Sequence, residues 1–168
     1  MICGIKPELK PRYIEIEGQM VIQLTMLSQD VDIVPVYLRP GEKWERDFFN
    51  LERVVIVDIT EQRGGESIVM TGDVNGRIGE GSSLDIGIEE CEYVGVLEPV
   101  RTSIKDKIAN AQGRRIIGLC EENDMVILNG RTPGDHKGEF TFVGTMGSSV
   151  IDLACISRAL VQRLGISQ

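Results

Sequence analysis

Apolar and polar residues alternate along much of the N-terminal third of the chain, and this is the period of a half-buried β-strand. The segment from Tyr13 to Leu27 contains IEIEGQMVIQLTML. It predicts either two strands or one strand interrupted by a turn at its central glycine. DVDIVPVYLRPG follows it and predicts a further strand, closed by Pro40 and Gly41.

The spacing then changes to that of an amphipathic helix. In EKWERDFFNLERVV the apolar residues Trp44, Phe48, Leu51 and Val55 recur on one helical face among charged residues. Residues 67–71 form a short β-branched run, SIVMT, which predicts a buried strand after this helix. A strand, a helix and a buried strand in this order favour an α/β fold.

The second half of the chain begins with a glycine-rich stretch. Residues 79–103 lack a clear period and predict a long loop, with one short strand near residues 93–97. NAQGRRIIGLCEENDMVILNG predicts a helix that ends near Asn123 and a strand from Met125 to Leu128. EFTFVG and SSVIDLACIS predict two further strands around a glycine-containing turn, and residues 158–164 have helical spacing.

Composition limits the classes of function. The 168 residues are of single-domain size, with 26 acidic against 18 basic side chains and a net charge of −8. Such a chain repels nucleic acid and anionic membranes, so a nucleic-acid partner requires a local basic patch or a bound cation. No apolar run is long enough to cross a bilayer, and we expect an intracellular protein, nuclear or cytoplasmic, with no membrane partner.

The four cysteines, Cys3, Cys91, Cys120 and Cys155, are far apart and form no C-x-x-C pair. This spacing argues against a zinc site and against a small disulfide scaffold. We therefore expect buried, reduced thiols.

SIVMTGDVNGRIG places Asp73 and Asn75 at the carboxyl end of a predicted strand, where open α/β sheets bind ligands. A carboxylate there can orient or deprotonate a water, and a neighbouring amide can donate to an anionic oxygen. A calcium loop is excluded, because Arg77, Ile78 and Leu84 stand where it needs ligands or glycine. A plain turn at Asn75-Gly76 stays open, since this dipeptide is a strong turn signal.

Other polar residues allow similar alternatives. His136 lies in PGDHKGE, whose composition is typical of a solvated turn. Asp152 interrupts the apolar run SSVIDLACI, which implies either a buried structural partner or a functional site. Tyr37 and Thr141 are interpreted from pattern alone as ordinary strand residues. The basic residues Arg114, Arg115, Arg131 and Lys137 allow contact with phosphates, but on an acidic chain they are interpreted as scattered surface charges.

The order of these segments is more specific than any one of them. VYLRPG, VMTGDVNGRIG, GRRIIGLCEENDMVILNGRTPGDHKGEFTF and GSSVIDLACIS together resemble the endonuclease/exonuclease/phosphatase superfamily. Within it the sequence is most similar to the apurinic-type endonuclease domain of insect-like non-LTR retrotransposons. The resemblance covers residues 13–168 as an incomplete domain and leaves residues 1–12 as an extension.

The resemblance implies a partial four-layer α/β sandwich, in which two packed mixed sheets are flanked by helices, and Mg²⁺-dependent hydrolysis of DNA. By position it implies that Asp73 activates or orients water and that Asn75 holds the phosphate. Tyr37 would contact the phosphate through its hydroxyl, Thr141 would support the site, and Asp152 would orient a catalytic histidine.

Both ends of the chain depart from the family pattern. The family's N-terminal strands, one with a metal-binding Glu, have no counterpart before Tyr13, and its C-terminal Ser-Asp-His strand has none after Asp152. His136 cannot replace this histidine, because it belongs to the upstream turn. We therefore expect weak Mg²⁺ binding, negligible nuclease activity in isolation and exposed sheet edges. A non-catalytic relic with the same fold and a phosphatase of the superfamily remain the alternatives.

Overall fold

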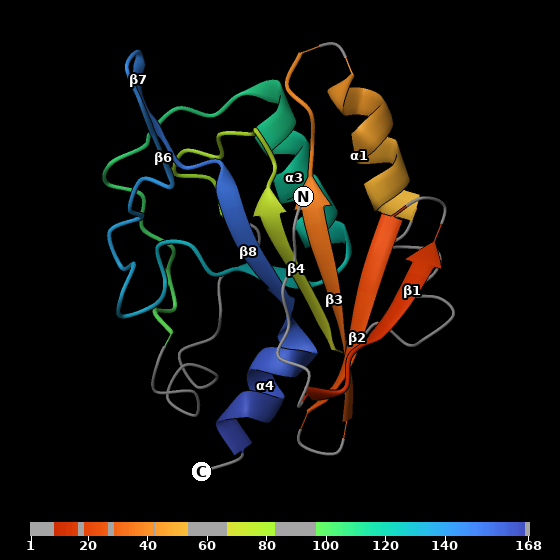
Figure 1. The fold of residues 1–168 in the computed structure, drawn as a ribbon. Helices are drawn as coiled ribbons and strands as arrows, with labels where there is room; N and C mark the ends of the chain where they lie inside the picture. Colours follow the sequence, from red (N-terminus) through yellow and green to blue (C-terminus); the bar gives the residue numbers. More distant parts are fainter. Residues whose placement is uncertain are drawn as a thin grey trace.

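The computed structural model describes residues 9–16, 19–26, 29–41, 43–53, 67–82 and 97–166. Their strands form one six-stranded mixed sheet, in the order β1-β2-β3-β4-β8-β5, and a separate hairpin, β6-β7 (Figure 1). The strands are β1 (Arg12–Ile16), β2 (Gln19–Met26), β3 (Gln29–Tyr37), β4 (Ile68–Asp73), β5 (Met125–Ile127), β6 (Phe142–Gly144), β7 (Gly147–Ser149) and β8 (Asp152–Ser157). The helices are α1 (Trp44–Arg53), α3 (Ala111–Glu122) and α4 (Arg158–Ile166).

The expected mixed α/β class is confirmed, and the architecture is that of a partial α/β sandwich. Within the described residues one sheet is large, whereas the second is only the β6-β7 hairpin. The alternating N-terminal segment forms two strands, because β1 and β2 pair antiparallel on either side of the predicted turn. The strand near residues 93–97 falls almost entirely outside the described residues.

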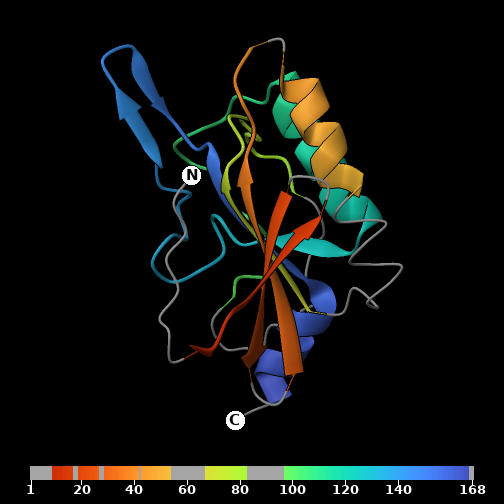
Figure 2. The same cartoon turned by 45° about the vertical axis from the view of Figure 1, so that its right-hand side comes forward.

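Helices cover both faces of the large sheet. On one face Phe48 and Leu51 of α1 and Ile116 and Leu119 of α3 pack against apolar side chains of the sheet. On the other face Val161 of α4 packs in a smaller apolar cluster. Successive residues of β5 divide between these two clusters, since side chains alternate across a strand. Figure 2 shows α1 and α3 side by side along the sheet and α4 at its lower end.

The prediction of one continuous strand over SSVIDLACIS is wrong. It divides into β7, which ends at Ser149, and β8, which begins at Asp152. The interruption has a local cause, because the backbone N–H groups of Val150 and Ile151 donate to side chains, at 2.9 Å and 3.0 Å, instead of to a neighbouring strand. The first half of the run is thereby free to form the projecting hairpin.

Arg131 contradicts its interpretation as a surface charge, because it is 0% exposed. Its guanidinium donates to the carbonyl oxygens of Glu98 and Pro99 and to the Ser82 hydroxyl. Backbone oxygens thus replace the water that a charged group needs. Arg114, Arg115 and Lys137 are exposed, as predicted.

Cys120 and Cys155 are buried free thiols, which confirms the expectation for these two cysteines. Cys3 and Cys91 lie outside the described residues. Among the described helices, none is long and apolar enough to span a membrane.

Candidate functional site

Three of the predicted site residues lie on adjacent strands at one edge of the sheet. Tyr37 ends β3 and is paired in register with Asp73, which ends β4. Asp73 is in turn paired with Asp152, which begins the antiparallel strand β8. Residues paired in this way project from the same face of a sheet, with Cβ atoms about 5 Å apart. These three residues, hereafter the site edge, form one row of a hydroxyl and two carboxyl groups.

Gly72 explains how β3 and β4 approach at this edge. Its φ is 142°, in a region that residues with a Cβ rarely adopt. A Cβ at this position would lie 2.1 Å from the carbonyl oxygen of Val36 on β3. The glycine of GDVN is therefore required for the pairing that brings Tyr37 beside Asp73.

Residues 74–78, hereafter the site loop, follow Asp73 and leave the sheet. Hydrogen bonds fix the course of this loop. Asn75 has a φ of 47°, which asparagine tolerates, and its N–H donates to Asp73 Oδ1 at 2.9 Å. Its side-chain amide donates to the carbonyl oxygen of Leu38 at 2.9 Å. The turn interpretation of Asn75-Gly76 is therefore compatible with the site interpretation, because the turn itself holds the Asp73 carboxylate.

The N-terminus of α3 supports the site loop from behind. Asn110 caps this helix and accepts hydrogen bonds from Gly113 N at 2.8 Å and from Arg77 N at 3.1 Å. Gln112 donates to the carbonyl oxygen of Val74 at 3.0 Å. The loop and the helix approach so closely that a Cβ on Gly113 would lie 2.0 Å from the Arg77 carbonyl oxygen.

The Asp73 carboxyl is electrostatically unusual. Burial raises its pKa, and the neighbouring carboxylate of Asp152 raises it further, although the hydrogen bond from Asn75 opposes both effects. Asp73 thus holds a proton more readily than an ordinary aspartate does. A carboxylate with a raised pKa is a stronger proton acceptor, which suits a group that activates water.

Asp152 is held through its backbone. Thr141 Oγ1 accepts from the N–H groups of Ile151 and Asp152, both at 3.0 Å. Asn129 donates to the carbonyl oxygen of Asp152 at 3.1 Å and accepts from Ala154 N at 2.9 Å. In the part of the chain that the structure describes, no group donates to the Asp152 carboxylate, which leaves it available for an outside partner.

Sequence reasoning missed Asn129, which bonds the backbone of β8, and Asp106, which accepts a hydrogen bond from Val150 N at 2.9 Å. Asn129 belongs to the segment VILNG, within the region of resemblance, and was a detectable signal. Asp106 lies in SIKDKIAN, which has the composition of a surface segment. Asp106 is nevertheless only 2% exposed. Nothing in its local spacing distinguishes it.

His136 is not part of the site edge. It is exposed in the turn after α3 and β5, and its Nδ1 lies 3.0 Å from the carbonyl oxygen of Pro133. The prediction of a solvated turn is confirmed for this residue.

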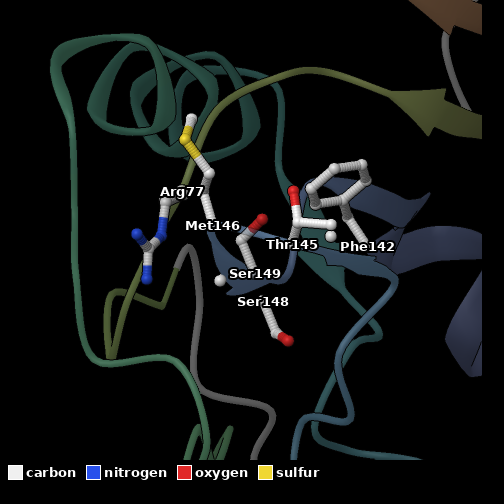
Figure 3. A pocket seen from close by; sticks show the side chains of 8 residues that line it. Arg77, Phe142, Thr145, Met146, Ser148 and Ser149 are labelled. Atoms are coloured by element: carbon white, nitrogen blue, oxygen red, sulfur yellow. The ribbon is translucent and has the colours of Figure 1, made fainter.

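An open cavity of about 350 Å³ lies between the site loop and the hairpin (Figure 3). Among the described residues that line it, Arg77 is the one that carries a charge. The hairpin contributes the aromatic ring of Phe142 and the hydroxyl groups of Thr145, Ser148 and Ser149. Met146 at the hairpin tip is fully exposed.

Carboxylates are the groups at the site edge that could hold a cation. Among the described residues, no three Asp, Glu, His or Cys side chains gather closely enough to hold a metal ion. The site edge offers two carboxylates. Two carboxylates are a partial ligand set for Mg²⁺, which keeps several waters and is usually bound by one or two carboxylates together with phosphates of its substrate.

Comparison of the sequence with protein families finds no match, and comparison with curated proteins finds none either. Among solved structures, the fold is similar to that described as "Endonuclease domain of TRAS1, a telomere-specific non-LTR retrotransposon". The TM-score is 0.53 at 17% sequence identity, and the match covers 88% of this chain and 54% of that chain. The protein thus shares the fold of part of that domain and spans about half the length of the structure it matches.

Proposed function

We propose that this chain carries part of the active site of a Mg²⁺-dependent phosphodiesterase, the DNA-nicking endonuclease of a non-LTR retrotransposon. The observation that carries the proposal is the site edge. Tyr37, Asp73 and Asp152 are far apart in sequence but occupy paired positions on β3, β4 and β8. These are residues to which the resemblance assigns chemical roles, and a partial fold of the same kind supports the assignment.

Each side chain has a role that its contacts allow. Asp73, fixed through Oδ1 by the N–H of Asn75, orients a water and accepts its proton through the other oxygen. Asn75 has a second amide N–H besides the one bonded to Leu38, and this N–H donates to a phosphate oxygen. Tyr37, which is 51% exposed, presents its hydroxyl to the same phosphate.

The remaining groups come from outside the described residues. A cation bound to such a site neutralises charge that develops on the phosphate. The ligand that completes its set, and the histidine that Asp152 orients, belong in this proposal to flanking sequence or to another chain. The isolated chain accordingly binds Mg²⁺ weakly and nicks DNA negligibly.

DNA approaches an acidic chain only where positive charge is local. Arg77, a partly exposed residue of the site loop, lines the wall of the cavity, but its charge is offset by the paired Asp106, so a bound cation must supply most of the positive charge. The hairpin hydroxyl groups supply donors for phosphate oxygens, and Phe142, which is 51% exposed, offers a ring for stacking. This cavity is the surface proposed to receive a strand of the substrate.

Nicking of supercoiled plasmid tests the proposal. Four proteins are compared: this chain, a chain extended through the flanking reading frame, and the Asp73→Ala form of each. The extended chain is expected to nick with Mg²⁺ and to lose about 10²–10⁴-fold in rate on Asp73→Ala. The matched control is His136→Ala in the exposed turn, which leaves the rate unchanged.

Two results oppose the proposal. Nicking that survives Asp73→Ala excludes Asp73 from the chemistry. Stop codons on both sides of this reading frame would favour the non-catalytic relic. So would flanking sequence that lacks the upstream Glu strand and the downstream Ser-Asp-His.

A further inference from the structure

Asp106 is a buried carboxylate to which the proposed chemistry gives no role. Although the residue is 2% exposed, it is fully engaged. Arg77 donates to it in a fork, with Nη2 2.6 Å from Oδ1 and Nε 3.0 Å from Oδ2. Val150 N donates to Oδ2 at 2.9 Å, and Ile108 N donates to Oδ1 at 3.1 Å.

The carboxylate is held in its charged form. Burial alone would raise the pKa of Asp106, but the hydrogen bonds from Arg77, Val150 and Ile108 outweigh burial and keep it below the ordinary value. A forked pair between a guanidinium and a carboxylate fixes direction as well as distance. The contact therefore sets the orientation of whatever segments it joins.

The two segments it joins lie next to the two carboxylates of the site edge, one after Asp73 and the other before Asp152. Arg77 belongs to the site loop, two residues beyond Asn75. Val150 lies two residues before Asp152, at the point where the chain leaves the hairpin and enters β8. The β4–β8 ladder pairs Asp73 with Asp152, and a further backbone hydrogen bond, from Val74 N to Ile151 O at 2.9 Å, continues it toward this contact.

We propose that Asp106 is a positioning residue of the site: beyond the end of the β4–β8 ladder, its bonds to Arg77 and to Val150 N hold the site loop, and with it Asn75, against the segment that leads into Asp152. The catalytic importance of Asp106 rests on the proposed function. Its effect on the local structure can be measured without an activity assay. Apolar residues would fill the same space at less cost in desolvation, so this buried pair is explained better by the arrangement it specifies than by stability.

The first experiment measures amide hydrogen exchange in this chain. The probes are the N–H groups of Asn75 and Asp152, which donate to Asp73 and Thr141 and do not touch Asp106. Asp106→Asn keeps the shape and removes the charge, and is expected to speed exchange of both probes about tenfold or more. Amides in the core of α3 keep their rates.

The matched control is Asp124→Asn. Asp124 also pairs with an arginine, with Arg158 Nε 3.0 Å from its Oδ1, but at the opposite end of β8 from Asp152. It is expected to leave both probes unchanged. A second variant, Arg77→Gln, keeps the two amide donors to Asp106 and removes only the ion pair.

The second experiment uses the extended chain, once it nicks DNA. Asp106→Asn is expected to lower kcat about 10²-fold with KM unchanged, because a small misplacement of reacting groups acts on the chemical step. If the extended wild type fails to nick, the proposed function fails, and the exchange data still decide the positioning role.

Unchanged exchange at both probes in folded Asp106→Asn and Arg77→Gln proteins would overturn the inference. Loss of folding in both variants would also overturn it, because the pair would then support the core instead of the site.

Discussion

Replacing Gly72 by alanine is the most direct test of how the site edge is built. Two separate effects oppose the added methyl group. The φ of 142° is strained for any residue with a Cβ and costs about 1–3 kcal/mol. The Cβ would also lie 2.1 Å from the Val36 carbonyl oxygen, so the backbone must move, and overpacking of this kind costs about 1–3 kcal/mol more.

Gly72→Ala is therefore expected to lower the free energy of unfolding by about 2–6 kcal/mol, out of the roughly 5–15 kcal/mol of an ordinary domain. Urea unfolding followed by tryptophan fluorescence measures it, since Trp44 begins α1 beside the core. With a slope of about 2 kcal/mol per molar, the midpoint falls by about 1–3 M. Gly118→Ala is the control, because nothing lies within 4 Å of a Cβ there. Equal midpoints for the two variants would refute the reasoning.

Three further outcomes follow from the same geometry. Gly113→Ala, on the helix face that meets the site loop, is expected to lower the free energy of unfolding by about 1–3 kcal/mol, whereas Gly118→Ala in the same helix raises it by about 1 kcal/mol; urea midpoints compare them. Because burial raises the pKa of Asp73, ionisation of this carboxyl destabilises the folded state above about pH 4. Asp73→Asn is therefore expected to raise the melting temperature at neutral pH, and the increase is expected to disappear as the solution is acidified. An equal gain at all pH values contradicts it. In a variant without the other two cysteines, the buried thiols of Cys120 and Cys155 are expected to resist a thiol reagent at pH 8 until urea unfolds the protein, and fast labelling of the native state contradicts this.

Local pattern was sufficient for most elements. Alternation identified β1, β2 and β3, and helical spacing identified α1, α3 and α4. The spacing of apolar residues differs between strands and helices because each element buries one face. It failed at the boundary between β7 and β8. There the backbone donors bond to Asp106 and Thr141, and these partners are remote in sequence.

The site shows the same division. The sequence by itself determined that Asp73 and Asn75 follow a buried strand, that Gly72 precedes them and that Asp152 interrupts an apolar run. Only the tertiary structure decided that β8 lies antiparallel beside β4, which brings Asp152 opposite Asp73, and that Asp106 is buried and bonded to Arg77 and Val150 N. The physical reason is that strand pairing and the burial of a charge depend on contacts between distant segments, and their hydrogen-bond partners have no fixed spacing along the chain.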